Sequence, residues 1–153
     1  MTGGFPLPEP MRRALALADE AAADGEVPVG AVITDPAGTI VAEARNAMRG
    51  GSDPTAHAEM LAIRRAGEAL ATSRLDGCTL WVSLEPCAMC AGAIALARID
   101  KLVFAAEDPK GGGVVHGAKV FTQSTCHHRP EVMGGLGEAE AARQLRDFFA
   151  ARR

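Results

Sequence analysis

The sequence predicts an α/β fold of three layers, in which helices cover both faces of one central mixed sheet. Three observations carry this prediction. The first and last segments of the chain have helical periodicity. Four strand-like segments lie between them, and two further helical segments separate the later strands. The 153 residues suit one compact core and contain no second core, linker or internal repeat. We therefore expect residues 1–153 to form a single domain.

The first half of the chain contains two helical patterns on either side of a hairpin. Residues 9–24 place apolar side chains on one helical stripe, and Gly25 ends that helix. Residues 29–35 and 39–46 flank a short Pro-Ala-Gly segment, which predicts two strands joined by a tight turn. A second helix covers about 54–70, with a proline near its start, where the missing N–H costs nothing.

The second half alternates strands and helices before an irregular segment. Residues 78–84 are largely apolar and have the length of a buried strand. A helix over 87–98 follows, and then a strand over 101–106. Residues 108–131 are rich in glycine and proline, so we expect an irregular loop with a functional role. Residues 138–153 resemble a terminal amphipathic helix.

Composition and charge exclude several classes of protein. No apolar run approaches the roughly 18 residues that a membrane-spanning helix needs, and the N-terminus lacks the pattern of a secretory signal. We therefore expect a cytoplasmic location. The net charge of −3 argues against a general nucleic-acid-binding protein, which carries a basic surplus. Four cysteines in a cytoplasmic chain indicate metal binding or burial more than disulfides.

Two short motifs contain the residue types that bind zinc. One is His57-Ala58-Glu59, and the other is Pro86-Cys87-Ala88-Met89-Cys90. Each is placed at a predicted helix N-terminus, where free N–H groups and the helix dipole favour a thiolate over a thiol. Imidazole and thiolate are both good zinc ligands. The combined pattern predicts a zinc site formed by His57, Cys87 and Cys90.

The number of ligands predicts the type of site. Three protein ligands leave one coordination position for water, whose pKa zinc lowers toward neutrality, whereas a structural zinc site has four. Glu59 lies two residues from His57, about 200° around a helix, so it suits proton transfer better than ligation. A fourth ligand from Cys78 or Cys126 would instead indicate a non-catalytic, zinc-stabilised RNA-binding module. The other interpretation of these two cysteines is a buried or incidental thiol.

At these motifs the chain resembles the bacterial tRNA-specific adenosine deaminases of the cytidine deaminase-like fold. The segments that carry the resemblance are GEVPVGAV (25–32), DPTAHAEM (53–60), LEPCAMCAGAI (84–94) and RDFFAARR (146–153). The resemblance implies hydrolytic conversion of adenosine to inosine at the wobble position of a tRNA anticodon. It also implies one Zn²⁺ per subunit, Glu59 as the catalytic proton carrier, a homodimer and an arginine tRNA as substrate.

The resemblance assigns further residues to the substrate. Asn46 matches the asparagine that hydrogen-bonds the target base, and we expect the backbone of Leu84 and Glu85 to recognise the base edge. Val27 and Pro28 either line the pocket or pack the start of a strand. The residues expected to meet RNA are Asp108, Lys110, Arg129, Phe149, Arg152 and Arg153. The alternatives are solvated surface charges for the basic residues and packing of the last helix for Phe149.

Several positions in the RNA-binding region depart from the family pattern. Glu107 stands where many relatives have a basic residue, and residues 111–116 and 126–129 also differ. These departures affect individual RNA contacts and leave the zinc motif unchanged. A competing hypothesis is a deaminase of a free base or nucleoside, such as guanine or cytidine, with the same zinc chemistry.

Overall fold

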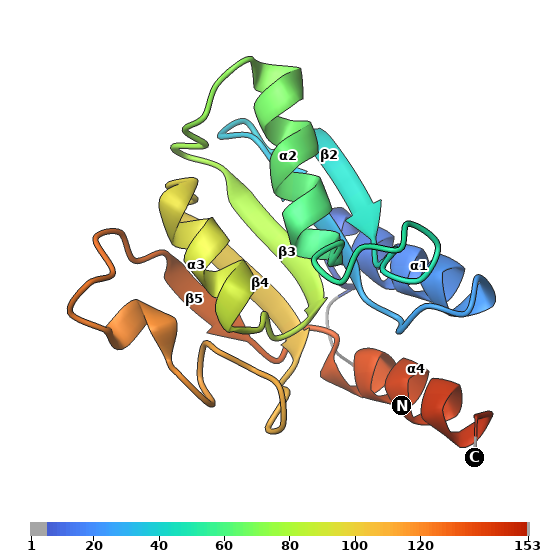
Figure 1. The fold of residues 1–153 in the computed structure, drawn as a ribbon. Helices are drawn as coiled ribbons and strands as arrows, with labels where there is room; N and C mark the ends of the chain where they lie inside the picture. Colours follow the sequence, from blue (N-terminus) through green and yellow to red (C-terminus); the bar gives the residue numbers. More distant parts are fainter. Residues whose placement is uncertain (1–5, 153) are drawn as a thin grey trace.

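The chain forms a five-stranded sheet between two layers of helices in a computed structural model, which describes residues 6–152 (Figure 1). This arrangement confirms the predicted three-layer α/β/α fold with a mixed sheet. The elements in chain order are α1 (Glu9–Ala23), β1 (Gly30–Thr34), β2 (Ile40–Arg45), α2 (Ala58–Leu70), β3 (Thr79–Leu84), α3 (Ala88–Leu96), β4 (Lys101–Ala106), the short 3-10 helix η1 (Val120–Thr122), β5 (Glu131–Gly134) and α4 (Glu138–Ala150).

The strand order explains where a site can form. The order across the sheet is β2-β1-β3-β4-β5, with β1 antiparallel to both of its neighbours and the β3–β4 and β4–β5 pairs parallel. The predicted tight turn joins β1 to β2, and Gly38 takes a positive φ of 88° there. Because β3 and β4 run in the same direction, the residues that follow Leu84 and Ala106 meet at one edge of the sheet. The loops after these strands form the candidate site.

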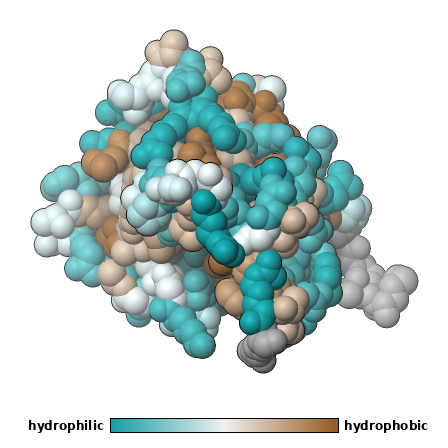
Figure 2. All heavy atoms as spheres, turned by 45° about the vertical axis from the view of Figure 1, so that its right-hand side comes forward, coloured by the Kyte–Doolittle hydropathy of each residue, from teal (hydrophilic) through white to brown (hydrophobic). Residues whose placement is uncertain are grey.

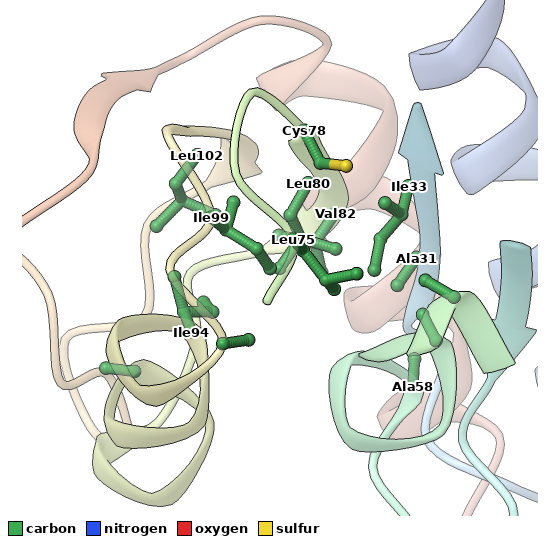
Figure 3. Close-up of a cluster of buried hydrophobic side chains, with 14 of the residues drawn as sticks. Ala31, Ile33, Ala58, Leu75, Cys78, Leu80, Val82, Ile94, Ile99 and Leu102 are labelled. Carbon is green, nitrogen blue, oxygen red and sulfur yellow. The ribbon is translucent and has the colours of Figure 1, made fainter. Parts of the chain in front are cut away.

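Two hydrophobic clusters lie on opposite faces of the sheet. Along β1, Ala31 and Ile33 pack toward α2 and α3, whereas Val32 between them packs toward α1 and α4. This alternation is the period of two that a strand imposes on its side chains. Figure 3 shows the first cluster, in which side chains of β1, β3, β4, α2 and α3 converge. Both faces of the sheet are therefore covered along its central strands, as the predicted layers require.

The strand β5 is not predicted from the sequence, which assigns Glu131 to the end of an irregular loop. All four residues of β5 are exposed, so they show no alternating apolar pattern. Main-chain pairing with β4 holds the strand, with Lys101 opposite Glu131 and Phe104 opposite Gly134. A Cβ atom at Gly134 would lie 2.6 Å from the Phe104 ring, so a glycine is required for this close approach.

The surface of the molecule is largely polar on one face. On the face that Figure 2 shows, hydrophilic side chains predominate and hydrophobic ones form small separate groups. Within residues 6–152, no helix has both the length and the apolar character that crossing a bilayer would need.

Candidate active site and zinc centre

The zinc motifs lie at the N-termini of α2 and α3, as predicted. His57 is the N-cap of α2, and Cys87 is the N-cap of α3. The Nδ1 atom of His57 lies 3.6 Å from the Sγ atom of Cys87 and 3.6 Å from that of Cys90. With Zn–N near 2.0 Å and Zn–S near 2.3 Å, a tetrahedral ion separates its nitrogen and sulfur ligands by about 3.5 Å. The three side chains therefore already have the spacing that zinc requires.

The cluster contains no fourth metal-binding side chain within the described part of the chain. His57, Cys87 and Cys90 are the one group of three or more such residues, with their ligand atoms within 4.8 Å of one another. Cys78 is buried in the core beneath the sheet, among aliphatic side chains (Figure 3). The thiol of Cys126 donates a hydrogen bond to the carbonyl of His128 at 3.2 Å. Neither of the two cysteines that a structural zinc site would use is available to the cluster.

The two cluster thiols differ in their acidity. A hydrogen bond from the Cys90 thiol, together with the N–H groups of Cys90 and Met89 at the start of α3, lowers the pKa of Cys87 to about 5. The same hydrogen bond to Cys87, together with burial, raises the pKa of Cys90. Cys87 is thus a thiolate at neutral pH even without the metal. A preformed negative charge in the cluster is suited to capture a divalent cation.

Glu59 lies in the first turn of α2 and is only 4% exposed. It lines the same pocket as His57 and Cys87, and it is not part of the metal-binding cluster. Burial is the main reason that its pKa is raised to about 7, and the nearby Cys87 charge adds to that increase. A carboxylate with a pKa near neutrality can both accept and donate a proton during one reaction cycle.

The pocket beside Glu59 has a volume of about 160 Å³, well below the roughly 300–1,000 Å³ of a site for a drug-sized ligand. It suits a single base. Its lining residues are Val27, Val29, Asn46, Met48, His57, Glu59, Leu84, Glu85, Cys87 and Asp108. Val29 and Met48 were not expected from the sequence. Pro28, for which pocket lining was one interpretation, is instead fully buried in the interior.

Asn46 is fixed in the pocket by two hydrogen bonds. Its Nδ2 atom donates to the Val27 carbonyl at 3.1 Å, and its Oδ1 atom accepts the N–H of Ala58 at 2.9 Å. The second bond satisfies one of the free N–H groups at the start of α2. One N–H of Nδ2 remains for another partner, because a primary amide has two. Asn46 therefore faces the pocket with its orientation already determined.

Glu85 has a different environment from the one expected. Its backbone N–H donates to the Ala106 carbonyl at 2.8 Å and so continues the pairing of β3 with β4. The N–H of Glu85 is therefore not available to a base, which leaves the other backbone groups of Leu84 and Glu85 for the predicted recognition of the base edge. The side chain of Glu85 is buried and organises the loop that follows β4.

The carboxylate of Glu85 accepts five hydrogen bonds from this loop. Burial by itself raises the pKa of Glu85, but the hydrogen bonds outweigh burial and hold the pKa below its usual value. Glycine allows the close approach, since a Cβ atom at Gly112 would lie 2.4 Å from Glu85 Oε2. The donors are the backbone N–H groups of Asp108, Val114, Val115 and His116 and the His116 Nδ1 atom.

A larger groove of about 740 Å³ adjoins the pocket and shares Val27, Leu84 and Asp108 with it. Besides Asp108, it brings together three residues that the sequence assigns to RNA binding. These are Lys110 and Arg152, both exposed, and Phe149, which is 47% exposed. The neighbouring Phe148 is buried, and the two rings lie edge to face with their centroids 5.3 Å apart. The other residues of the groove are Glu107, Gly111 and Leu145.

The remaining predicted RNA contacts are not in this groove. The guanidinium of Arg129 donates to the carbonyls of Phe121 and Gln123, so it stabilises the loop before β5. Arg152 also has an internal role, since its guanidinium lies 3.5 Å from the centroid of the Phe148 ring. Arg153 lies outside the residues that the structure describes.

Comparison with known proteins agrees with the zinc cluster. The family model of the cytidine and deoxycytidylate deaminase zinc-binding region matches residues 8–106. The chain is 50% identical to a tRNA-specific adenosine deaminase of Agrobacterium fabrum over 94% of this chain and 93% of that protein. A structure from a study of A-to-I editing by tRNA:A34 deaminases shares 49% identity and a TM-score of 0.87, over 89% of this chain and 98% of that one.

A guanine deaminase of Nitrosomonas europaea has the same fold, with 26% identity and a TM-score of 0.81 over 96% of this chain and 87% of that one. The identity to the tRNA enzymes is about twice as high, and it extends over nearly the full length of both chains. The chain therefore belongs to the zinc-binding cytidine and deoxycytidylate deaminase group and, within it, to the family of the tRNA-specific adenosine deaminases.

Proposed function

We propose that this protein converts adenosine to inosine at the wobble position of a tRNA anticodon, and that residues 1–153 form one deaminase domain. The observation that supports this function most directly is the position of the zinc cluster. It lies in a pocket for a single base, and that pocket opens into a groove with an exposed aromatic ring and two cations. A tRNA substrate also fits the cytoplasmic location that the sequence predicts.

The reaction replaces the C6 amino group of adenine with oxygen from water and releases ammonia. Zinc held by His57, Cys87 and Cys90 supplies the Lewis acidity that makes water a nucleophile near neutral pH. The Glu59 carboxylate accepts a proton from the attacking water. It delivers this proton to the ring nitrogen N1, takes the second proton of the former water from the new hydroxyl on C6, and passes it to the amino group, which leaves as ammonia when the C6–N bond breaks. The raised pKa of Glu59 fits this double role.

Asn46 and the pocket walls hold the base during these steps. The free N–H of Asn46 Nδ2 suits a ring nitrogen of the purine, since that atom is an acceptor. Val27, Val29 and Leu84 provide apolar contacts for the flat base. Because the pocket accepts only one base, the nucleotide must leave its stack, which costs less in an anticodon loop than in a duplex.

The groove provides contacts for the neighbouring nucleotides. We assign stacking of an adjacent base to Phe149 and phosphate contacts to Lys110 and Arg152. A free base would fill the pocket and leave this groove empty. The aromatic ring and the two cations therefore favour a polynucleotide substrate over guanine or cytidine. The resemblance to the bacterial family favours an arginine tRNA among the possible substrates.

A substrate comparison tests the proposed function. The zinc-loaded enzyme is incubated with the anticodon stem-loop of an arginine tRNA that carries adenosine at the wobble position, and separately with guanine, cytidine and free adenosine. We expect inosine in the stem-loop and no ammonia from the free compounds. A stem-loop with guanosine at the wobble position is the matched control. Ammonia from guanine or cytidine, with no inosine in the stem-loop, would show that the substrate is a small molecule.

We further propose that the enzyme is a homodimer that uses the outer face of α3. This helix has no charged residue, Leu96 at its C-terminal end is 82% exposed, and Met89 in its first turn is also exposed. An exposed apolar helix favours a protein contact. We expect Leu96→Asp to give a monomer in light scattering after gel filtration. The control Leu70→Asp, at an exposed position of α2, should remain dimeric. A monomeric parent protein would refute the proposal.

A further inference from the structure

Glu26 is a buried carboxylate that the mechanism above does not use. It directly precedes Val27, which lines the base pocket, and only 5% of its surface is exposed. A carboxylate is a hydrogen-bond acceptor, and burying it away from water is unfavourable unless donors satisfy its oxygens. The donors that Glu26 uses therefore show which part of the molecule this residue holds in place.

Both donors come from residues 47–51, the segment that follows β2 and Asn46. Oε1 of Glu26 accepts the backbone N–H of Arg49 at 3.2 Å, and Oε2 accepts that of Gly50 at 2.8 Å. In the opposite direction, the guanidinium of Arg49 donates to the Gly25 carbonyl at 3.4 Å. These three hydrogen bonds join the segment 25–27 to the segment 47–51.

Each of the two joined segments supplies one residue to the wall of the base pocket. The first supplies Val27, and the second supplies Met48, which is next to Arg49 in the chain. Residues 47–51 belong to no helix or strand, so no regular ladder of hydrogen bonds fixes them. The position of Met48 in the pocket wall thus depends on individual bonds such as those to Glu26.

Building on the proposed function, we propose that Glu26 is a positioning residue, which holds Met48 against the target base and so sets how tightly the pocket binds adenine. Glu26 itself neither lines the pocket nor belongs to the metal-binding cluster. Asn46 is held by the Val27 carbonyl and the Ala58 N–H, without a bond to Glu26. Loss of the Glu26 carboxylate should therefore raise KM for the stem-loop and change kcat much less.

Three single variants test this role, with zinc content and thermal unfolding measured for each. Glu26→Gln keeps the size of the side chain but turns an NH₂ group toward one of the two N–H donors. We expect KM to rise about three- to tenfold, as for the loss of one buried hydrogen bond, and kcat to change less than about threefold. Glu26→Asp keeps the charge but is too short to reach both donors, so its KM should rise by a similar factor. Glu20→Gln, at an exposed position of α1, is the matched control and should leave KM unchanged.

A double-mutant cycle shows whether Glu26 acts through Met48. Met48→Ala should itself raise KM, because it removes part of the pocket wall. The double variant Glu26→Gln with Met48→Ala should stay within about twofold of Met48→Ala, since no methionine side chain remains to be held. Lys110 lies in the groove and is assigned to a phosphate, so the effects of Lys110→Ala and Glu26→Gln on KM should multiply. If Glu26→Gln does not fold, Glu26→Asp takes its place in both cycles.

Three outcomes would overturn this inference in a parent enzyme that deaminates the stem-loop. The first is an unchanged KM in both Glu26 variants. The second is a pair of effects from Glu26→Gln and Met48→Ala that multiply, which would mean that Glu26 does not act through Met48. The third is a normal KM in Glu26→Asp with a raised KM in Glu26→Gln, which would make the charge important and not the two bonds. A parent enzyme that deaminates guanine and not the stem-loop would instead refute the proposed function.

Discussion

Replacing Glu59 with Ala is expected to lower kcat about 10²- to 10⁴-fold, the usual contribution of a positioned proton carrier. Zinc content and fold should be retained, because Glu59 is not part of the metal-binding cluster. The thermal midpoint should not decrease, since burial of this carboxyl raises its pKa and so opposes its charged form. The measurements are inosine formation in a stem-loop, zinc by mass spectrometry and thermal unfolding.

Two further variants control this experiment. Glu59→Gln keeps the size of the side chain but cannot accept a proton, so its kcat should be as low as that of Glu59→Ala. Glu68→Ala removes an exposed glutamate from the same helix and should retain full activity. Retained turnover in Glu59→Ala would contradict the assigned role of this residue.

Removal of a cluster thiol should have the second large effect, which is loss of zinc. Cys87→Ala and Cys90→Ala each leave two of the three protein ligands, so both should contain substoichiometric zinc after dialysis and show no measurable deamination. Cys90→Ala should also unfold at a lower temperature than Cys87→Ala, because Cys90 is fully buried and Cys87 is not. Metal analysis and thermal unfolding of each variant measure these effects.

The other two cysteines provide the matched controls. Cys78→Ser and Cys126→Ser remove thiols that lie outside the cluster, so both should retain one zinc per chain. Cys78→Ser should be the less stable of the two, since it places a hydroxyl in the apolar core. Substantial zinc loss from Cys78→Ser in a folded protein would mean that the site is closed and structural.

Most of the fold was predictable because its elements carry strong local signals. The helix α1 shows apolar side chains at helical spacing and ends at Gly25, which takes a positive φ of 79°. The strand β4 has the predicted bounds of 101–106, since both of its faces are buried and it reads as one apolar run. By contrast, β5 is exposed throughout and depends on main-chain pairing, so its side chains do not identify it.

The zinc cluster was predictable for a related reason. His57 lies at the N-terminus of α2, and Cys87 and Cys90 lie at the N-terminus of α3. Because a helix fixes the relative positions of the residues at its start, the spacing of these residues in the sequence predicts how their side chains are arranged. The close approach of the two helices comes from the crossover between strands, which the alternation of helix and strand also predicts.

The loop after β4 could not be predicted in the same way. The role of Glu85 depends on backbone N–H groups more than twenty residues later, and no periodic pattern records such a contact. The one sequence signal was the glycine-rich segment, which indicates that another group packs closely against its backbone but does not identify that group. Met48 lines the pocket from another irregular segment, so its role was not predicted. Arg129 is not on the expected RNA surface, because its guanidinium bonds to local carbonyls.

X-ray absorption at the zinc edge of the full-length, zinc-loaded protein tests the central claim most directly, because it counts the protein ligands without an activity assay. We expect two sulfur neighbours near 2.3 Å and a single imidazole, with the fourth position left to solvent. A third sulfur or a second imidazole would contradict this account, since a zinc site closed by the protein has no position for water and does not support hydrolysis.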